Sequence, residues 1–108
     1  MFSQWIYQTF YFLLSLVNLK VELAISPVVE DNILSMKCNV FGGESVTRYY
    51  WKRNGAAQSE TGSTITLNNV QKSSNGDVYK CQAVVNAQTS NEASDAVVVY
   101  CKSLSKNV

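Results

Sequence analysis

The chain contains no histidine and a single proline, and only 16% of its 108 residues are charged. The lack of histidine removes the commonest general base and a common metal ligand. The sequence also has no nucleophile elbow, no glycine-rich phosphate loop and no set of ligands at metal spacing. We therefore expect a protein that is not an enzyme and that needs no cofactor and no metal.

Neither sign of charge dominates the chain. Nine basic and eight acidic residues are spread along it, for a net charge of +1. Without a basic stripe, nucleic acid is not expected as a partner. No Asn-X-Ser/Thr sequon occurs either, so N-linked glycosylation is not expected. The length fits one domain whose small core would benefit from a covalent link.

An apolar, uncharged stretch occupies residues 1–19, before the first charge at Lys20. Its densest part is short for a membrane span, so we expect a secretory signal peptide over residues 1–19. An uncleaved signal anchor is the alternative. Membrane association is expected only through such an anchor or through a segment outside this sequence. The seven residues 102–108 are expected to be a linker or a frayed end.

Between these segments, apolar and polar residues alternate as in half-buried strands. Pro27 follows the first such run and suits a strand edge or a strand switch. Asn54-Gly55 is a strong signal for a two-residue hairpin, because both positions tolerate positive φ. The expected strands are 21–26, 34–40, 48–52, a short strand near 56–59, 64–67, 78–85 and 96–101.

The spacing of Cys38, Trp51 and Cys81, with Tyr79 two residues before the second cysteine, resembles the immunoglobulin superfamily over about residues 20–101. The resemblance implies an all-β fold, an immunoglobulin-like Greek-key β-sandwich of two antiparallel sheets. It implies one inter-sheet disulfide between Cys38 and Cys81, which persists only in an oxidising compartment. It also implies that Trp51 packs against the bridge in the core. Tyr79 would form a tyrosine corner, with its hydroxyl bonded to backbone upstream.

The stretch after Trp51 is too short for the two extra strands of a variable-type domain. It favours the short seven-strand type or the related intermediate type. Asn75 stands where the family usually has an acidic residue, which removes an ion pair common in variable-type domains. Asp77 is interpreted as a solvated turn residue.

Strand parity assigns a set of outward side chains to one sheet, and this C–F–G face is the expected contact surface. Tyrosine and arginine are enriched at interface hot spots, although tyrosine and valine are also simply good strand formers. A second candidate is the polar 86–92 loop, which we expect to be long and solvated. The face comprises Arg48, Tyr50, Lys52, Gln82, Val84, Val98 and Tyr100.

Cys101 is the odd cysteine. A disulfide to another chain, a bridge to a segment outside this sequence and a free thiol all remain open. Taken together, the resemblance implies an extracellular module, secreted or at the cell surface, that recognises another protein homophilically or heterophilically in adhesion or immune-type binding. The alternative is a structural spacer repeat of a larger adhesion or matrix protein, with no ligand of its own.

Overall fold

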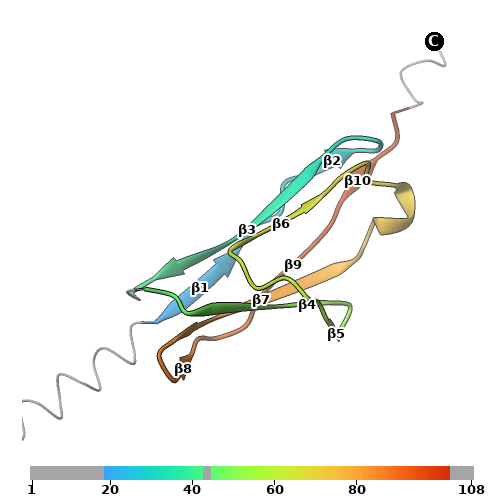
Figure 1. Ribbon diagram of the computed structural model, residues 1–108. Coiled ribbons are helices and arrows are strands. Elements are labelled where there is room, and N and C mark those ends of the chain that lie inside the picture. The colour runs from blue at the N-terminus through green and yellow to red at the C-terminus, as the bar shows by residue number, and fades with distance from the viewer. Residues whose placement is uncertain (1–18, 43–44, 103–108) are drawn as a thin grey trace, which may run out of the picture.

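The computed structural model describes residues 19–42 and 45–102, and these form two packed layers of β-strands (Figure 1). The expected signal peptide of residues 1–19 lies outside the described residues, apart from Leu19. No helix within the described ranges is long and apolar enough to cross a membrane. The expected all-β sandwich is confirmed.

One layer is a three-stranded antiparallel sheet in the order β1-β3-β6. The other contains β5-β4-β7-β8, and β9 also pairs with β7. A parallel pair joins β2, the second strand, to β10, the last strand of the described residues. The bounds are β1 Lys20–Leu23, β2 Val28–Val29, β3 Leu34–Phe41, β4 Arg48–Arg53, β5 Ala56–Ala57, β6 Thr64–Leu67, the 3-10 helix η1 Lys72–Ser74, β7 Val78–Val85, β8 Gln88–Thr89, β9 Ala93–Ala96 and β10 Val99–Tyr100.

Alternation explains the burial of β3, where Leu34, Met36 and Cys38 are buried and the residues between them are exposed. The apolar side chains meet those of β7, because in each strand every second residue points to the same face. The core lies between the two sheets and includes contributions from β1, β6 and the end of the chain.

The disulfide between Cys38 and Cys81 crosses the two layers and closes a loop of 43 residues, as the resemblance implied. Trp51 pairs with Cys81 in the β4–β7 register and is 1% exposed. Its indole Nε1 donates to the Gly62 carbonyl at 2.9 Å, which satisfies the one polar atom of a buried ring. The disulfide and the Trp51 ring together hold β3, β4 and β7 in contact.

Tyr79 is buried beside this centre at 3% exposure, and burial raises the pKa of its phenol. The hydroxyl makes no hydrogen bond with any described residue. The ring thus lies where a tyrosine corner would place it, but the backbone bond of that corner is not formed.

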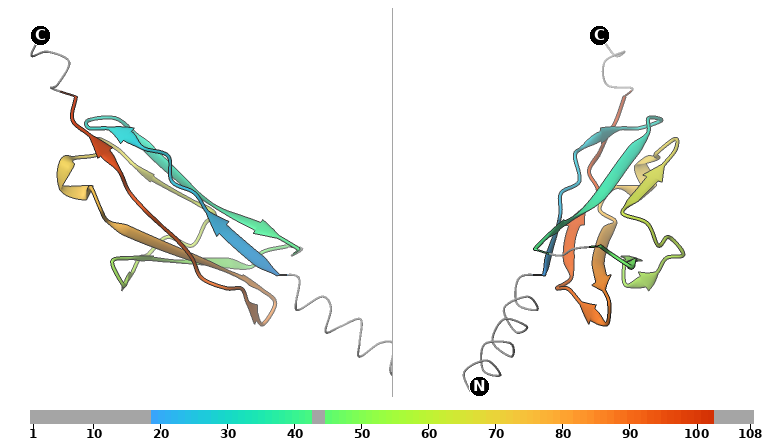
Figure 2. Two further views of the ribbon diagram at one scale, coloured as in Figure 1. Left: turned by 180° about the vertical axis from the view of Figure 1, so that it is seen from behind. Right: turned by 60° about the vertical axis from the view of Figure 1, so that its left-hand side comes forward.

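Pro27 marks a change of layer. β1 ends at Leu23 and pairs with β3, whereas β2 begins at Val28 and pairs with β10 on the other side of the sandwich (Figure 2). A residue without a backbone N–H suits this unpaired crossing. The expected hairpin at Asn54-Gly55 is also present, with φ of 50° and 85° at the two turn positions.

The final strand differs from its expected bounds of 96–101. It starts earlier, as β9 at Ala93 paired with β7, and it is interrupted before β10 pairs with β2. The alanines and serine of β9 lack the β-branched signal that marks a strand in sequence. Strand formation here is imposed by the neighbouring ladder.

The expected long loop at residues 86–92 was wrong. β8 pairs with the end of β7, so only Asn86 and Ala87 form the turn, with Asn86 at a φ of 57°. Ser90 is buried, and its hydroxyl accepts from the Ala83 N–H at 3.0 Å. The polar residues of this segment predict a solvated loop, but the Ser90 hydroxyl instead satisfies a backbone N–H of β7.

Candidate recognition surface

The outward side of β4 and β7 carries five of the seven side chains expected on the C–F–G face. The β4–β7 register places Arg48 opposite Val84, Tyr50 opposite Gln82, and Lys52 opposite Lys80. Because directly opposed side chains on one face lie within about 5.5 Å at their Cβ atoms, these residues form one continuous surface. We call it the Tyr50 face: Arg48, Tyr50, Lys52, Gln82 and Val84.

An aromatic ring and a cation lie together on the Tyr50 face. Tyr50 is 46% exposed, and the Arg48 guanidinium carbon lies 5.6 Å from the centroid of its ring. This distance is within the range of a cation–π contact, which contributes about 0.5–1 kcal/mol at an exposed site. The contact limits the rotamers of both side chains.

An ion pair borders the Tyr50 face. Lys52 Nζ lies 3.0 Å from Glu92 Oε2, and this hydrogen bond from Lys52 holds the pKa of Glu92 below its usual range. Sequence analysis assigned Glu92 to a solvated loop, because the two residues are 40 positions apart and no local pattern links them. Pairing of β9 with β7 brings them together.

Val98 and Tyr100 do not join the Tyr50 face. Both are exposed, as parity predicts, but they follow the β7–β9 pair of Val78 and Ala96. Counted along β7 and β9 from the Tyr50–Gln82 pair, Val98 lies six residues away and Tyr100 eight, or about 20 and 26 Å at 3.3 Å per residue. Tyr100 instead pairs with the exposed Val29. We call Val29, Val98 and Tyr100 the Tyr100 end.

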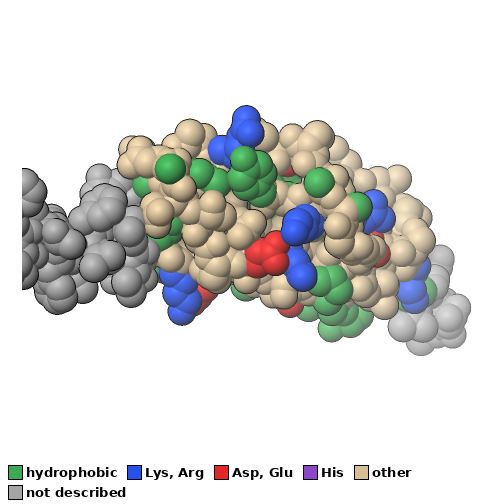
Figure 3. Space-filling model, turned by 90° about the horizontal axis from the view of Figure 1, so that it is seen from below, with side chains coloured by type: hydrophobic (Ala, Val, Ile, Leu, Met, Phe, Trp, Pro, Cys, Tyr) green, Lys and Arg blue, Asp and Glu red, His purple; other side chains and the backbone are tan. Residues whose placement is uncertain are grey.

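Figure 3 shows hydrophobic side chains in separate groups on the side seen from below, with Lys, Arg, Asp and Glu side chains between them. The exposed apolar side chains therefore do not form one continuous patch on this side.

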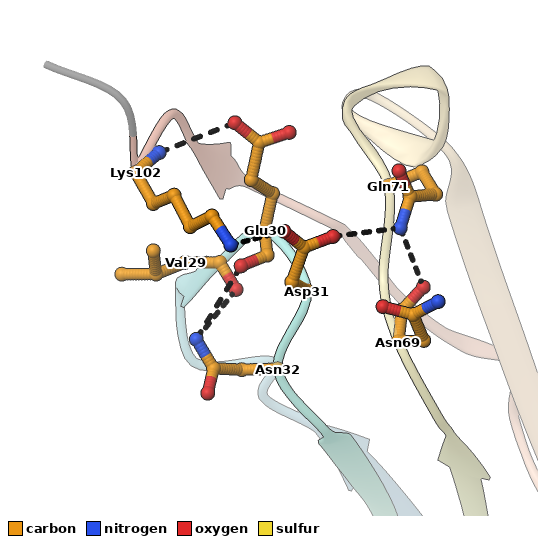
Figure 4. A network of polar contacts seen from close by, with 7 residues as sticks. All are labelled: Val29, Glu30, Asp31, Asn32, Asn69, Gln71 and Lys102. Atoms are coloured by element: carbon orange, nitrogen blue, oxygen red, sulfur yellow. Dashed lines mark hydrogen bonds and ion pairs between the residues drawn. The ribbon is translucent and has the colours of Figure 1, made fainter.

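The Tyr100 end adjoins a network of polar contacts (Figure 4). Lys102 Nζ lies 2.6 Å from Asp31 Oδ2, and the Lys102 backbone N–H donates to Glu30 Oε1 at 3.2 Å. Gln71 donates to the other carboxylate oxygen of Asp31 at 3.0 Å. These bonds lower the pKa of Asp31 and raise that of Lys102. The network fastens the last described residue to two turns.

Asp77 is not the solvated turn residue that sequence analysis expected. Its carboxylate lies 2.9 Å from the Arg53 guanidinium and 3.0 Å from the Asn54 side-chain nitrogen, and its side chain is only 13% exposed. The β4–β7 register brings Arg53 beside the start of β7. The ion pair thus ties the β4–β5 hairpin to β7. Asn75 has a separate role, because its Oδ1 accepts from the Val99 N–H at 2.8 Å.

A pocket of about 520 Å³ opens between β3 and β4. Its lining includes Val40, Val46 and Tyr49 and no residue of the Tyr50 face. Within residues 19–42 and 45–102, no three His, Cys, Asp or Glu side chains group as metal ligands would. Cys101 is partly buried just after β10, away from the core disulfide.

Comparison with known proteins identifies relatives of this chain. An immunoglobulin domain family model matches residues 19–84. Human Kin of IRRE-like protein 3 is 33% identical over 85 residues, or 79% of this chain, and the mouse protein is 34% identical over the same length. The chain spans about a tenth of the length of these curated relatives.

Solved structures support the same fold at lower identity. The N-terminal four Ig domains of Dscam1 isoform 4.44 align with a TM-score of 0.64 at 18% identity, covering 76% of this chain and 21% of that one. The ectodomain of mouse nectin-like molecule 4 aligns with a TM-score of 0.58 at 24% identity, covering 78% and 30%. The aligned chains contain several such domains each.

Proposed function

Since the chain belongs to the immunoglobulin superfamily, we propose that it is an extracellular module that recognises another protein through the Tyr50 face. The observation that carries the proposal is the Arg48–Tyr50 contact on a continuous β4–β7 surface. Tyrosine and arginine are the side chains that most often carry binding energy at protein interfaces.

The rest of the Tyr50 face suits a partner protein. Val84 and the aliphatic part of Gln82 lie beside Tyr50 as a partly buried apolar centre. The Lys52–Glu92 pair supplies a polar rim of both signs, the usual surround of such a centre. A binding role of this kind needs no catalytic group, so the chain is proposed not to be an enzyme.

An oxidising location fits the same proposal. A disulfide that closes 43 residues would be reduced in the cytosol, whereas it persists in secreted and cell-surface proteins. The proposed arrangement is a signal peptide over residues 1–19, a sandwich domain over residues 20–101 and a linker over residues 102–108. Adhesion is the class of recognition that we favour.

A spacer role is the second candidate. It is favoured by the multi-domain chains with which this fold aligns and by the polar network that fastens Lys102 where the sandwich ends. A spacer would transmit position between neighbours and would bind no ligand of its own.

Saturable binding separates the two candidates. The full chain, produced in a secretory host and multimerised on beads, should bind a subset of cells displaying surface proteins with a measurable saturation point. Combining Tyr50→Ala with Val84→Glu should abolish this binding while leaving the melting temperature nearly unchanged. The change removes the aromatic anchor and adds a charge at the centre of the face.

Two substitutions on the opposite sheet provide the matched control. Ser35→Glu with Asn39→Ala alters exposed positions of β3 and changes the net charge by the same one unit, and binding should persist. Equal binding by the wild type and the Tyr50/Val84 variant would exclude the Tyr50 face. No saturable binding by the wild type to any surface would favour the spacer.

A further inference from the structure

The edges of the two sheets differ in how their backbone groups are satisfied. β1 and β9 lie at neighbouring edges, and side chains from the β9 region close the gap between them. Asn91 exchanges two bonds with the Val21 backbone, at 2.9 and 3.2 Å, and Asp95 accepts from the Ile25 N–H at 2.7 Å. These edges are therefore not free to pair with another strand.

β6 forms the opposite edge of the three-stranded sheet. It borders β3 on the side away from β1 (Figure 2, right), and no described strand pairs with its outer side. The segment before it turns toward the other sheet, where the Thr61 carbonyl accepts from Tyr49 and the Gly62 carbonyl from Trp51. The chain that could have covered β6 is used to close the core.

The β3–β6 register identifies the open backbone groups. Cys38 N–H donates to the Ser63 carbonyl at 2.8 Å, so that pair is hydrogen-bonded. Antiparallel pairs alternate, so Ile65 and Leu67 direct their backbone groups toward β3, opposite Met36 and Leu34. Thr64 and Thr66 direct their N–H and C=O groups outward, and none of these four groups has a partner among the described residues.

Sequence features that prevent edge pairing are missing from β6. Proteins protect exposed edges with lysine, proline, bulges or inward charges. Thr64–Leu67 has no charge, no proline and no glycine, and the flanking residues from Ser63 to Val70 are likewise uncharged. Threonine and isoleucine also favour extended backbone, so this edge is ready to accept a strand.

We propose that β6 is an interface at which two copies of this chain pair edge to edge. A two-fold axis through Ile65 places Thr64 of one copy opposite Thr66 of the other, with both outward-facing positions in register. This arrangement forms four main-chain hydrogen bonds and joins the two three-stranded sheets into one. The interface is isologous and uses up both edges, so assembly stops at a dimer.

The chemistry of the edge favours a second copy. On the outer face the joined sheet would align Lys37, Thr64, the second copy's Thr66 and its Ser35 in one row, by the register of β3 with β6. Threonine pairs directly opposite each other are favourable, and the two lysines stay three strands apart. No like charges meet across the axis.

Association through β6 is expected to be weak. A strand of four residues buries well under the roughly 1,200 Å² of stable complexes. Weak contacts become effective where copies are held at high local concentration, as on one surface. The dimer would leave the Tyr50 face, on the other sheet, available for its own partner.

Sedimentation of the full chain over a wide concentration range tests the proposal. The wild type should show a monomer–dimer equilibrium, and Thr66→Pro should raise the dissociation constant about tenfold or more. Proline removes an N–H that faces outward, so the internal ladder keeps its bonds while the dimer loses two of its four. Thr66→Lys should weaken dimerisation as well.

Asn39→Lys is the matched control, because it adds the same charge at an exposed position of β3 that pairs with β1 and not with β6. Every variant carries the same N-terminal stretch, so differences report the edge alone. Hydrogen exchange at the Thr64 and Thr66 amides should slow as the wild type is concentrated. A chain that stays monomeric at the highest concentrations, or a dimer unaffected by Thr66→Pro with unchanged Thr64 and Thr66 exchange, would overturn the proposal. Neither result bears on the Tyr50 face.

Discussion

The Tyr50 face and the Tyr100 end contain similar residues but differ in their support. Each has an exposed tyrosine beside a valine. Tyr50 lies on β4, which is paired along six residues with β7, and Arg48 lies over its ring. Tyr100 lies on a two-residue parallel pair beside a polar network of turns. Composition alone does not make a binding surface, since the rigidity of the supporting strands decides how much binding energy is retained.

Removing the disulfide should have the largest effect, because the strands that carry the Tyr50 face and the Tyr100 end pack on the same core. Replacing Cys38 and Cys81 with alanine should lower the free energy of unfolding by about 4 kcal/mol, as expected for a closed loop of 43 residues. Urea denaturation followed by tryptophan fluorescence measures the change. A loss below about 1 kcal/mol would mean that packing around Trp51 alone holds the sheets together.

Replacing Tyr50 and Tyr100 with alanine, one at a time, tests directly whether the two surfaces differ in binding. Tyr50→Ala should weaken binding of the cell-surface partner by about 2 kcal/mol, or roughly 30-fold, because an anchoring aromatic side chain is lost. Tyr100→Ala should change it by less than about 0.5 kcal/mol. Titration of labelled chain onto binding cells provides both values, and a larger effect at Tyr100 would reverse the assignment.

The smallest effect concerns pH at the Tyr100 end. The pKa of Asp31 is lowered by Lys102 and Gln71, so its contribution is present above the ordinary aspartate range and is lost as pH falls through the lowered value. The pKa of Lys102 is raised, so its contribution is lost as pH rises through that value. Amide signals of Lys102 and Gln71 should therefore shift in strong acid and strong base.

Asp31→Asn is the control for this titration. It removes the acid transition at Lys102, while the side-chain oxygen of the new asparagine still accepts the hydrogen bond from Gln71. An acid shift at Lys102 that persists in Asp31→Asn would show that Asp31 is not its source.

The Tyr50 face and the Tyr100 end also show where sequence-based prediction succeeded. Parity placed Tyr50, Val84, Val98 and Tyr100 outward, because alternation is a local property of the strand. It could not separate them along the sheet, because position in space depends on which strands pair and in what register. The same limit applies to Asp77, whose partner Arg53 is 24 residues away, and to Glu92 beside Lys52.

Ser90, Asn91 and Asp95 show the same limit in a polar segment. Their sequence is that of an ordinary solvated turn, yet they bond to backbone groups of β7, of β1 and of the residues just after β1. Polar side chains have no periodic signal for such roles. Only the meeting of two sheets supplies the backbone groups that they satisfy.

By itself the sequence determined the fold. Cys38, Trp51 and Cys81 at their spacing, with alternating residues around them, specify two sheets joined by a bridge. Burial and chain direction follow from that pattern, since hydrophobic side chains must lie on the shared inner face. The tertiary structure alone decided which outward residues gather into one surface and which strand edges stay open. Those properties depend on pairing between distant segments, and local sequence carries no record of the partner that a strand will meet.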